Sequence, residues 1–174
     1  MTFIEVLVAF VIIATGILGA VAMQATAKKA SYDSMQRSLA SSLAEDIIAR
    51  MRSNDVSALA SYESDTYGRG NYTQAAPERC ASIGTKCDKD EIVANDQYEW
   101  ELALMGKDAL RGGNPVGGLI NALGCIDVDG NNVTVVISWH GREKIKDAAK
   151  ATCGTTGGST GDKLRQIVVE SYII

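Results

Sequence analysis

The N-terminal part of the chain carries one uninterrupted apolar run. From Val6 to Met23 the sequence reads VLVAFVIIATGILGAVAM, eighteen residues without a charge and with Thr15 as the only polar side chain. A helix of this length and composition suits the hydrocarbon core of a bilayer or an equally dry protein environment. We therefore predict a hydrophobic N-terminal helix over residues 1–25.

The helical pattern continues beyond this run and becomes amphipathic. One face repeats apolar side chains every three or four residues: Leu39, Ala40, Leu43, Ala44, Ile47, Ile48 and Met51. Charged side chains fall largely on the remaining surface: Lys28, Lys29, Asp33, Arg37, Glu45, Asp46, Arg50 and Arg52. No glycine or proline interrupts Ala20 to Val56, so an amphipathic segment 26–56 continues one helix of about fifty residues, roughly 80 Å long. A domain of about 120 residues cannot cover such a helix, so its first half must be buried in a membrane or against other copies.

The remaining residues, 57–174, are predicted to form a β-rich globular domain. Val133–Trp139 is predicted to be a strand introduced by the turn Asp129-Gly130-Asn131, and Leu164–Ile174 alternates as a closing strand. Residues 60–95 are polar with glycine and proline breakers, which predicts an irregular segment. Glycine-rich loops are expected at 112–118 and 154–161.

One stretch of this domain admits two structures. Tyr98, Trp100, Leu102 and Leu104 alternate with other residues, which favours a strand by its period of two. A short helix over Met105–Leu110 competes for the same stretch, and the sequence leaves the choice open.

Glu5 is a lone carboxylate directly before the apolar run. Drawing an unpaired carboxylate into an apolar layer costs about 3 kcal/mol, so its position suggests a partner, and the nearest mobile positive charge is a free α-amino group. The alternative is a solvated acid at the helix N-terminus, favoured there by the helix dipole.

The residues around Glu5 argue against two common kinds of N-terminal segment. A secretory signal peptide would have a basic first region and a small-residue cleavage site, but no Lys or Arg precedes Lys28 and no A-x-A site closes the run. A single-pass anchor usually carries Lys or Arg on its cytoplasmic flank. That flank is only Met1-Thr2-Phe3-Ile4-Glu5, so we expect that a preceding segment has been removed.

Net charge and the cysteines indicate which partners and which kind of cysteine site to expect. A formal net charge of −4 gives no basic footprint for nucleic acid. All four cysteines, Cys80, Cys87, Cys125 and Cys153, follow the apolar run, and an even count fits disulfides in an oxidising compartment. Three pairings are possible, and sequence order favours 80–87 with 125–153. Zinc is the rival interpretation, but no C-x₂-C spacing exists and His140 is the only histidine.

The other motifs have simpler explanations than a ligand or catalytic site. Asp127–Asn131 resembles the opening of a calcium loop, but Ser138 stands where the twelfth-position glutamate belongs, and a hairpin turn explains the same residues. The run 154–161 lacks the Gly-Lys-Ser/Thr ending of a phosphate loop. His140 follows a strand and is predicted to be a surface histidine. Asn71-Tyr72-Thr73 and Asn132-Val133-Thr134 match the glycosylation sequon, which occurs often by chance. We expect no enzyme, cofactor or metal.

Two segments carry a family resemblance. Phe3–Phe10, FIEVLVAF, resembles the start of type IV pilins and pseudopilins after a prepilin peptidase has cut the leader and methylated the new N-terminal amine. Ala44–Asn54 resembles the helix end of the minor pilins called PilV. Similarity to that family continues at Trp100, Cys125 and Ser138-Trp139 and is weak over about 57–95 and 141–163. Many major pilins have a proline near position 22, where this chain has Ala22, and Gly16 and Gly19 are expected to loosen the helix instead.

The resemblance implies an α+β fold of the pilin type, a long N-terminal helix with an antiparallel sheet packed on its C-terminal half. It implies a structural subunit of an extracellular filament, foremost a minor pilin that primes assembly or serves tip function and adhesion. Glu5 would neutralise the methylated amine of Met1 on a neighbouring subunit. The implied partners are other pilins through their N-terminal helices, the inner membrane before assembly, the prepilin peptidase and the assembly machinery. The alternatives are a major pilin, a pseudopilin of type II secretion, and a membrane-anchored binding protein that never polymerises.

Overall fold

The computed structural model describes residues 2–75, 77, 80, 86–144, 152–153 and 163–174. The chain divides into two compact units, Met1–Met35 and Gln36–Ile174. The boundary lies inside helix α1 (Phe3–Ser53), a single helix of 51 residues, so the predicted long helix is confirmed. The predicted boundaries at residues 25 and 56 rest on hydropathy and not on contacts between residues. They therefore remain a prediction.

The first unit is helical from Phe3 onward. Thr2 precedes the helix, and the side chain of Glu5 in the first turn accepts a hydrogen bond from its backbone. No residue of the 18-residue apolar window is buried. This unit has no core of its own, so its stability in water depends on backbone hydrogen bonds and on whatever covers its side chains.

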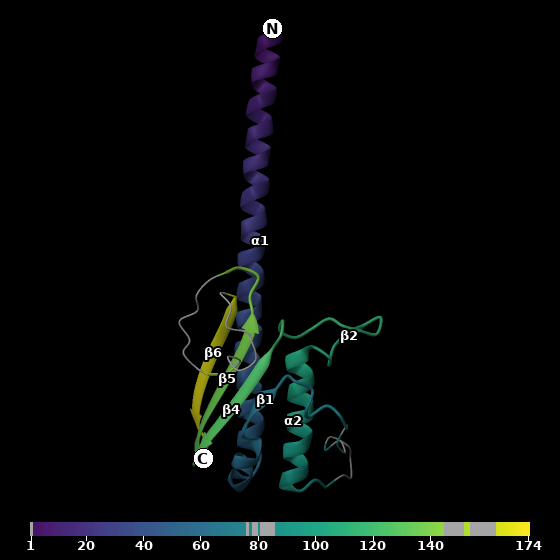
Figure 1. Cartoon of the computed structure of the whole chain (residues 1–174), viewed down its shortest axis with the longest axis vertical. Helices are drawn as coiled ribbons and strands as arrows, with labels where there is room; N and C mark the ends of the chain where they lie inside the picture. Colours follow the sequence, from purple (N-terminus) through teal and green to yellow (C-terminus); the bar gives the residue numbers. More distant parts are fainter. Residues whose placement is uncertain (1, 76, 78–79, 81–85, 145–151, 154–162) are drawn as a thin grey trace. The chain divides into compact units, whose positions relative to one another are not determined.

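The second unit combines the end of α1 with a four-stranded sheet, a two-stranded hairpin and a second helix (Figure 1). After α1 come the 3₁₀ helix η1 (Val56–Tyr62), strand β1 (Ser64–Tyr67) and helix α2 (Lys89–Met105). The remaining elements are β2 (Leu110–Arg111), β3 (Asn114–Pro115), β4 (Leu123–Asp129), β5 (Asn132–His140) and β6 (Leu164–Tyr172). The main sheet is antiparallel with strand order β1-β4-β5-β6, and β2 pairs with β3 in a separate hairpin.

The sheet packs with the end of α1 and with α2 in one hydrophobic core. The predicted apolar face of α1 contributes Ala40, Leu43, Ala44, Ile47, Ile48 and Met51. From β5 the core receives Val133, Val135, Ile137 and Trp139, alternate residues as a strand requires. The indole N–H of Trp100 on α2 donates to the carbonyl of Leu43 at 2.8 Å and so joins the two helices. The predicted α+β fold, with a long helix and an antiparallel sheet on its C-terminal part, is therefore confirmed.

The choice left open for residues 98–110 is resolved in favour of neither alternative. The strand pattern over 98–104 does not form a strand, because these residues belong to α2. The competing helix 105–110 does not form either, since α2 ends at Met105 and Leu110 begins β2. Asp88 caps α2 through a capping box with Glu91, and Gly106 ends it in the left-handed conformation at φ 68°. The helical face of α2 buries Val93, Asp96, Trp100, Glu101 and Leu104 together. Because this buried face includes the carboxylates of Asp96 and Glu101, its helical period is not visible in the hydropathy pattern.

The irregular segment predicted for 60–95 is also wrong over much of its length. It contains the end of η1, β1 and the first turns of α2, although residues 76, 78–79 and 81–85 lie outside the described residues. β1 is only four residues long, and its register with β4 shifts between Ser64 and Tyr67. Such a short edge strand has too few residues to show alternation.

The strands predicted at 133–139 and 164–174 are confirmed as β5 and β6. The turn at Asp129-Gly130-Asn131 joins β4 to β5, with Asp129 opposite Asn132 and Gly130 at φ 60°. β4 was not predicted as a strand. The glycine-rich loop expected at 154–161 lies outside the described residues.

Candidate functional site on the N-terminal helix

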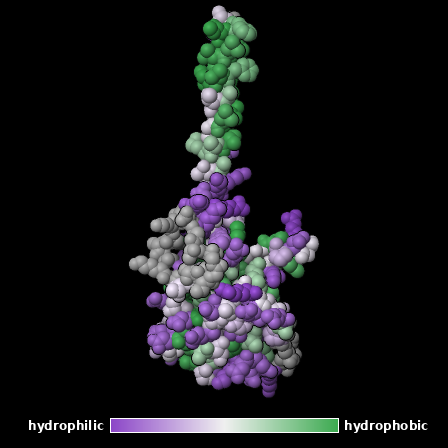
Figure 2. All heavy atoms as spheres, viewed as in Figure 1, coloured by the Kyte–Doolittle hydropathy of each residue, from purple (hydrophilic) through white to green (hydrophobic). Residues whose placement is uncertain are grey.

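The first unit exposes nearly all of its large apolar side chains. Those between residues 3 and 23 are Phe3, Ile4, Val6, Leu7, Val8, Phe10, Val11, Ile12, Ile13, Ile17, Leu18, Val21 and Met23. Figure 2 shows them as a nearly continuous hydrophobic surface along the helix. Within the described residues, α1 is the one helix that is long and apolar enough to cross a membrane, judged by length and composition. Soluble proteins rarely expose so large an apolar patch, so lipid or other protein chains must cover it.

Glu5 caps the start of this helix. Its Oε2 accepts a hydrogen bond from the backbone N–H of Thr2 at 2.7 Å, and its own N–H donates to the Thr2 carbonyl at 3.0 Å. A carboxylate in the first turn also interacts favourably with the helix dipole. The single chain thus shows the local role of Glu5. Met1, whose amine is the expected partner on a neighbouring subunit, lies outside the described residues, and that pairing stays a proposal.

The glycines in the apolar run leave the helix backbone accessible. A Cβ atom added at Gly16 or Gly19 would meet nothing within 4 Å, so neither glycine is required by packing inside this chain. α1 is continuous through both positions in the single subunit. The hydroxyl of Thr15 donates to the carbonyls of Val11 at 2.9 Å and Ile12 at 3.0 Å, so its polar group is satisfied within the helix.

Two disulfides follow the pairing favoured by sequence order. Cys80 is joined to Cys87, directly before the cap of α2, and Cys125 on β4 is joined to Cys153. The second bond fixes the segment at Cys153 to the sheet, where the side chain of Gln166 on β6 also donates to the Cys153 carbonyl at 2.6 Å.

In the exported protein we expect both bonds to be formed. Each would stabilise the fold by about 2–4 kcal/mol. Thiol labelling of denatured, unreduced protein should then find no free thiol. Cys125→Ser is the positive control, because it should free one thiol, that of Cys153. Labelling of two or more cysteines in the unaltered chain, or bound zinc in stoichiometric amount, would contradict the prediction.

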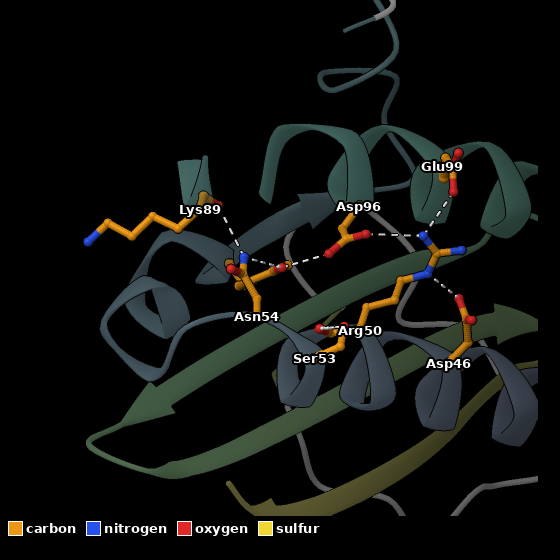
Figure 3. Close-up of polar contacts among 8 residues, drawn as sticks. Asp46, Arg50, Ser53, Asn54, Lys89, Asp96 and Glu99 are labelled. Carbon is orange, nitrogen blue, oxygen red and sulfur yellow. Dashed lines mark hydrogen bonds and ion pairs between the residues drawn. The ribbon is translucent and has the colours of Figure 1, made fainter. Parts of the chain in front are cut away.

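A charged cluster that the sequence did not predict joins α1 to α2 (Figure 3). Arg50 donates to Asp46 one turn earlier at 2.9 Å, and to Asp96 at 3.2 Å and Glu99 at 2.9 Å on α2. Burial alone would lower the pKa of Arg50, but the hydrogen bonds that Arg50 donates to Glu99 and Asp46 outweigh it and the pKa is raised. Arg50 therefore stays charged and holds the two helices together.

The cluster extends to Tyr62, which is fully buried at the end of η1. Its hydroxyl donates to Asp96 at 2.7 Å and accepts from the side-chain amide of Asn54 at 3.2 Å. Asn54 also donates to the carbonyl of Lys89 at 3.1 Å, at the start of α2. The sequence showed Asp46 and Arg50 four residues apart on one helical face. Only the fold shows that α2 completes the cluster.

Stability should fall as the pH rises above about 10, the ordinary pKa of tyrosine. Burial raises the pKa of Tyr62 and of Tyr67 in the folded chain, so both stay protonated while the unfolded chain loses these protons. Their contribution is complete below the unfolded-state pKa and is lost at about 1.4 kcal/mol per pH unit for each tyrosine above it. Denaturant titrations of the detergent-solubilised chain measure this slope. Tyr62→Phe should reduce it by about 1.4 kcal/mol per pH unit, and an unchanged slope would contradict the assignment.

A second missed group is the carboxylate of Glu101, which is completely buried. Its Oε1 accepts the backbone N–H groups of Gly68 at 2.9 Å and Gly70 at 3.0 Å, and its Oε2 accepts that of Tyr72 at 2.7 Å. Gly68 and Gly70 have φ of 94° and 85°, which turn their N–H groups toward the carboxylate. Glu101 therefore shapes the loop after β1.

Among the described residues, the remaining candidates form no catalytic or metal site. His140 lies 3.1 Å from the side-chain amide of Asn121, measured from its Nδ1. Asp127 and Asp129 lie on β4 beside the hairpin turn. No group of three or more His, Cys, Asp or Glu residues among those described could hold a metal ion.

The comparisons with known proteins give one family. A family model described as type IV pilin Tt1218, of the Tt1218-like group, matches residues 22–98. It covers less than half of the chain and supports a type IV pilin-like protein, a class of structural and non-enzymatic proteins. The match begins after most of the apolar run, so it is independent of the resemblance at residues 3–10. It also spans 57–95, where the similarity to PilV is weak. No curated protein and no solved structure matches the chain.

Proposed function

We propose that this chain is a structural subunit of an extracellular filament of the type IV pilus kind. The observation that carries the proposal is the exposed apolar surface of residues 3–23, which opens with a lone carboxylate at Glu5 and leads into a segment matched by a type IV pilin family model. A bilayer covers this surface before assembly, and the helices of neighbouring subunits cover it afterwards. This route takes the subunit from the inner membrane to the extracellular filament.

Within that route, Glu5 pairs with the N-methylated amine of Met1 on a neighbouring subunit. The pairing is compatible with the local bond from Thr2, because a carboxylate has acceptor sites for more than one donor. It also gives register, since a mispositioned subunit would leave one buried charge without a partner. The prepilin peptidase that produces such an amine, and the assembly machinery, are the remaining partners of the proposal.

The finer role is that of a minor pilin of the PilV kind, in assembly priming or in tip function and adhesion. The similarity of residues 44–54 to PilV supports it. A major pilin and a type II secretion pseudopilin share the same N-terminal pattern, so this pattern does not distinguish them from a minor pilin. The abundance of the chain in filaments distinguishes a minor from a major pilin. A membrane-anchored binding protein that never polymerises needs neither N-methylation nor Glu5.

Mass spectrometry of sheared filaments tests the proposal. The chain should be present with a methylated N-terminus, at a low ratio to the main subunit for a minor pilin and at a dominant ratio for a major one. A chain that stays in the membrane fraction and is absent from filaments would refute the filament function.

We also expect α1 to loosen between Ala14 and Met23 once the subunit is packed in a filament. Gly16 and Gly19 each disfavour the helix by about 1 kcal/mol relative to alanine, and neighbouring side chains could satisfy the freed backbone groups. In the bilayer the helix should stay continuous, because unsatisfied backbone groups are too costly there. Replacing both glycines by alanine should reduce filament extensibility. Unchanged assembly and extensibility, or a filament map with unbroken helical hydrogen bonds from Phe3 to Met51, would contradict this.

A further inference from the structure

The face of the main sheet that points away from the core carries an acidic row. The register places Asp127 of β4, Thr134 of β5 and Glu170 of β6 side by side, and Asp129, Asn132 and Tyr172 in the next row. Glu63 and Asp65, before and within β1, line the same groove as Asp127, and Glu170 lines the adjoining one. These two open grooves have volumes of about 760 and 470 Å³. We call the five carboxylates Glu63, Asp65, Asp127, Asp129 and Glu170 the acidic face.

The acidic face holds more negative charge than the whole chain. Its five carboxylates carry a formal charge of −5, whereas the entire chain carries −4, so the rest of the molecule is weakly positive. All five are exposed. Among the described residues none of them forms an ion pair, and no Lys or Arg lines either groove. Such a field favours a cationic partner.

The same unit presents an exposed arm of the opposite sign. Residues 107–117, which contain the hairpin of β2 and β3, are all exposed, and Figure 1 shows this hairpin standing out from the body of the unit. Lys107 and Arg111 give the arm a net positive charge against Asp108. Leu110 and Val116 expose 62% and 59% of their surface, so the arm also offers apolar contact. Gly112 and Gly113, at φ 60° and 81°, form its tight turn.

We propose that the arm of one subunit docks on the acidic face of a second copy of this chain. Arg111 and Lys107 would lie against Asp127 and Glu170, and Leu110 against the exposed Val168 and Tyr172 of β6. Charge complementarity selects this occupant. The inference rests on the proposed filament function, and it adds a contact between globular units to the contact between apolar helices.

The geometry of such a contact suits a filament. The arm and the acidic face are different surfaces, so the contact is heterologous, and a heterologous contact that does not close into a ring repeats as an open helical array. Because each chain carries both the arm and the acidic face, successive copies of it can bind one another along the filament. The contact requires at least two adjacent copies of this chain. Its detection would therefore favour the main-fibre role over that of a minor pilin present at a low ratio.

Charge reversal in the full chain, expressed in cells that make filaments, tests the contact. Arg111→Glu should reduce incorporation into sheared filaments at least about tenfold, because like charges across an interface are strongly unfavourable. Glu170→Arg in the same chain should restore it. Lys163→Glu, which changes the net charge equally outside the arm, should leave incorporation unchanged. Normal incorporation of Arg111→Glu, or failure of Glu170→Arg to rescue it, would overturn the proposal.

Cysteine cross-linking on whole cells gives an independent readout. A chain with both Arg111→Cys and Glu170→Cys should form a ladder of covalent oligomers with a short bis-maleimide. Two single variants expressed together should stop at dimers. Absence of any cross-link would refute the contact. If the unaltered chain is absent from filaments, the filament function fails, and the cross-link still decides whether copies held in the membrane make this contact.

Discussion

Replacing Glu5 by alanine is expected to leave the protein in the membrane and to remove it from filaments. The change deletes the only carboxylate near the apolar surface, so the amine of a neighbouring Met1 would be buried without its partner. Breaking a buried ion pair in this way costs about 3–5 kcal/mol, which reduces incorporation by a factor of about 100 or more. Quantitative immunoblots of the membrane and sheared-filament fractions measure the effect.

Glu5→Gln separates the two roles of this side chain. Glutamine keeps an oxygen that can accept the Thr2 N–H, as capping boxes with glutamine do, but it has no charge. If charge pairing drives assembly, both variants should be absent from filaments. Should Glu5→Gln assemble normally while Glu5→Ala fails, Glu5 would act as a helix cap alone. Glu45→Ala, on the amphipathic part of α1, is the control for loss of one carboxylate.

Replacing Glu101 by alanine should destabilise the second unit by about 3–5 kcal/mol. Three backbone N–H groups lose a charged acceptor in a site without solvent, and each hydrogen bond to a charged group contributes about 1.5–3 kcal/mol. A cavity remains where the buried side chain stood, which adds to the cost. Thermal and denaturant unfolding of the detergent-solubilised chain measure the loss.

Two further variants make this test specific. Glu101→Gln fills the same space but turns one acceptor into a donor, so it should lie between the unaltered chain and Glu101→Ala. Glu170→Gln, on the exposed face of β6, should change stability by less than about 0.5 kcal/mol. If Glu101→Gln were as stable as the unaltered chain, the three N–H bonds would not depend on the charge of Glu101.

The long helix and the two longest strands could be predicted from local sequence patterns alone. Their signals are local and repeat many times: eighteen uncharged residues, an apolar face from Leu39 to Met51, and a run rich in β-branched residues in β5. The lone carboxylate at Glu5 is equally visible, because it stands directly before the uncharged run. An even number of cysteines and their order likewise led to the pairing that the structure has.

The contacts between distant side chains and backbone groups could be seen only in the folded chain. The stretch from Tyr98 to Leu104 satisfies a strand pattern, but it becomes helical because Asp88 and Glu91 cap it and Trp100 and Leu104 pack together in the core. The capping box was a local signal that could have identified this helix. Nothing local marks Glu101 as the acceptor of three N–H groups some thirty residues earlier in the chain, or Arg50 as the partner of Asp96 and Glu99. A buried charge is stable only where the fold supplies its partners, and those partners are set by chain topology rather than by sequence spacing.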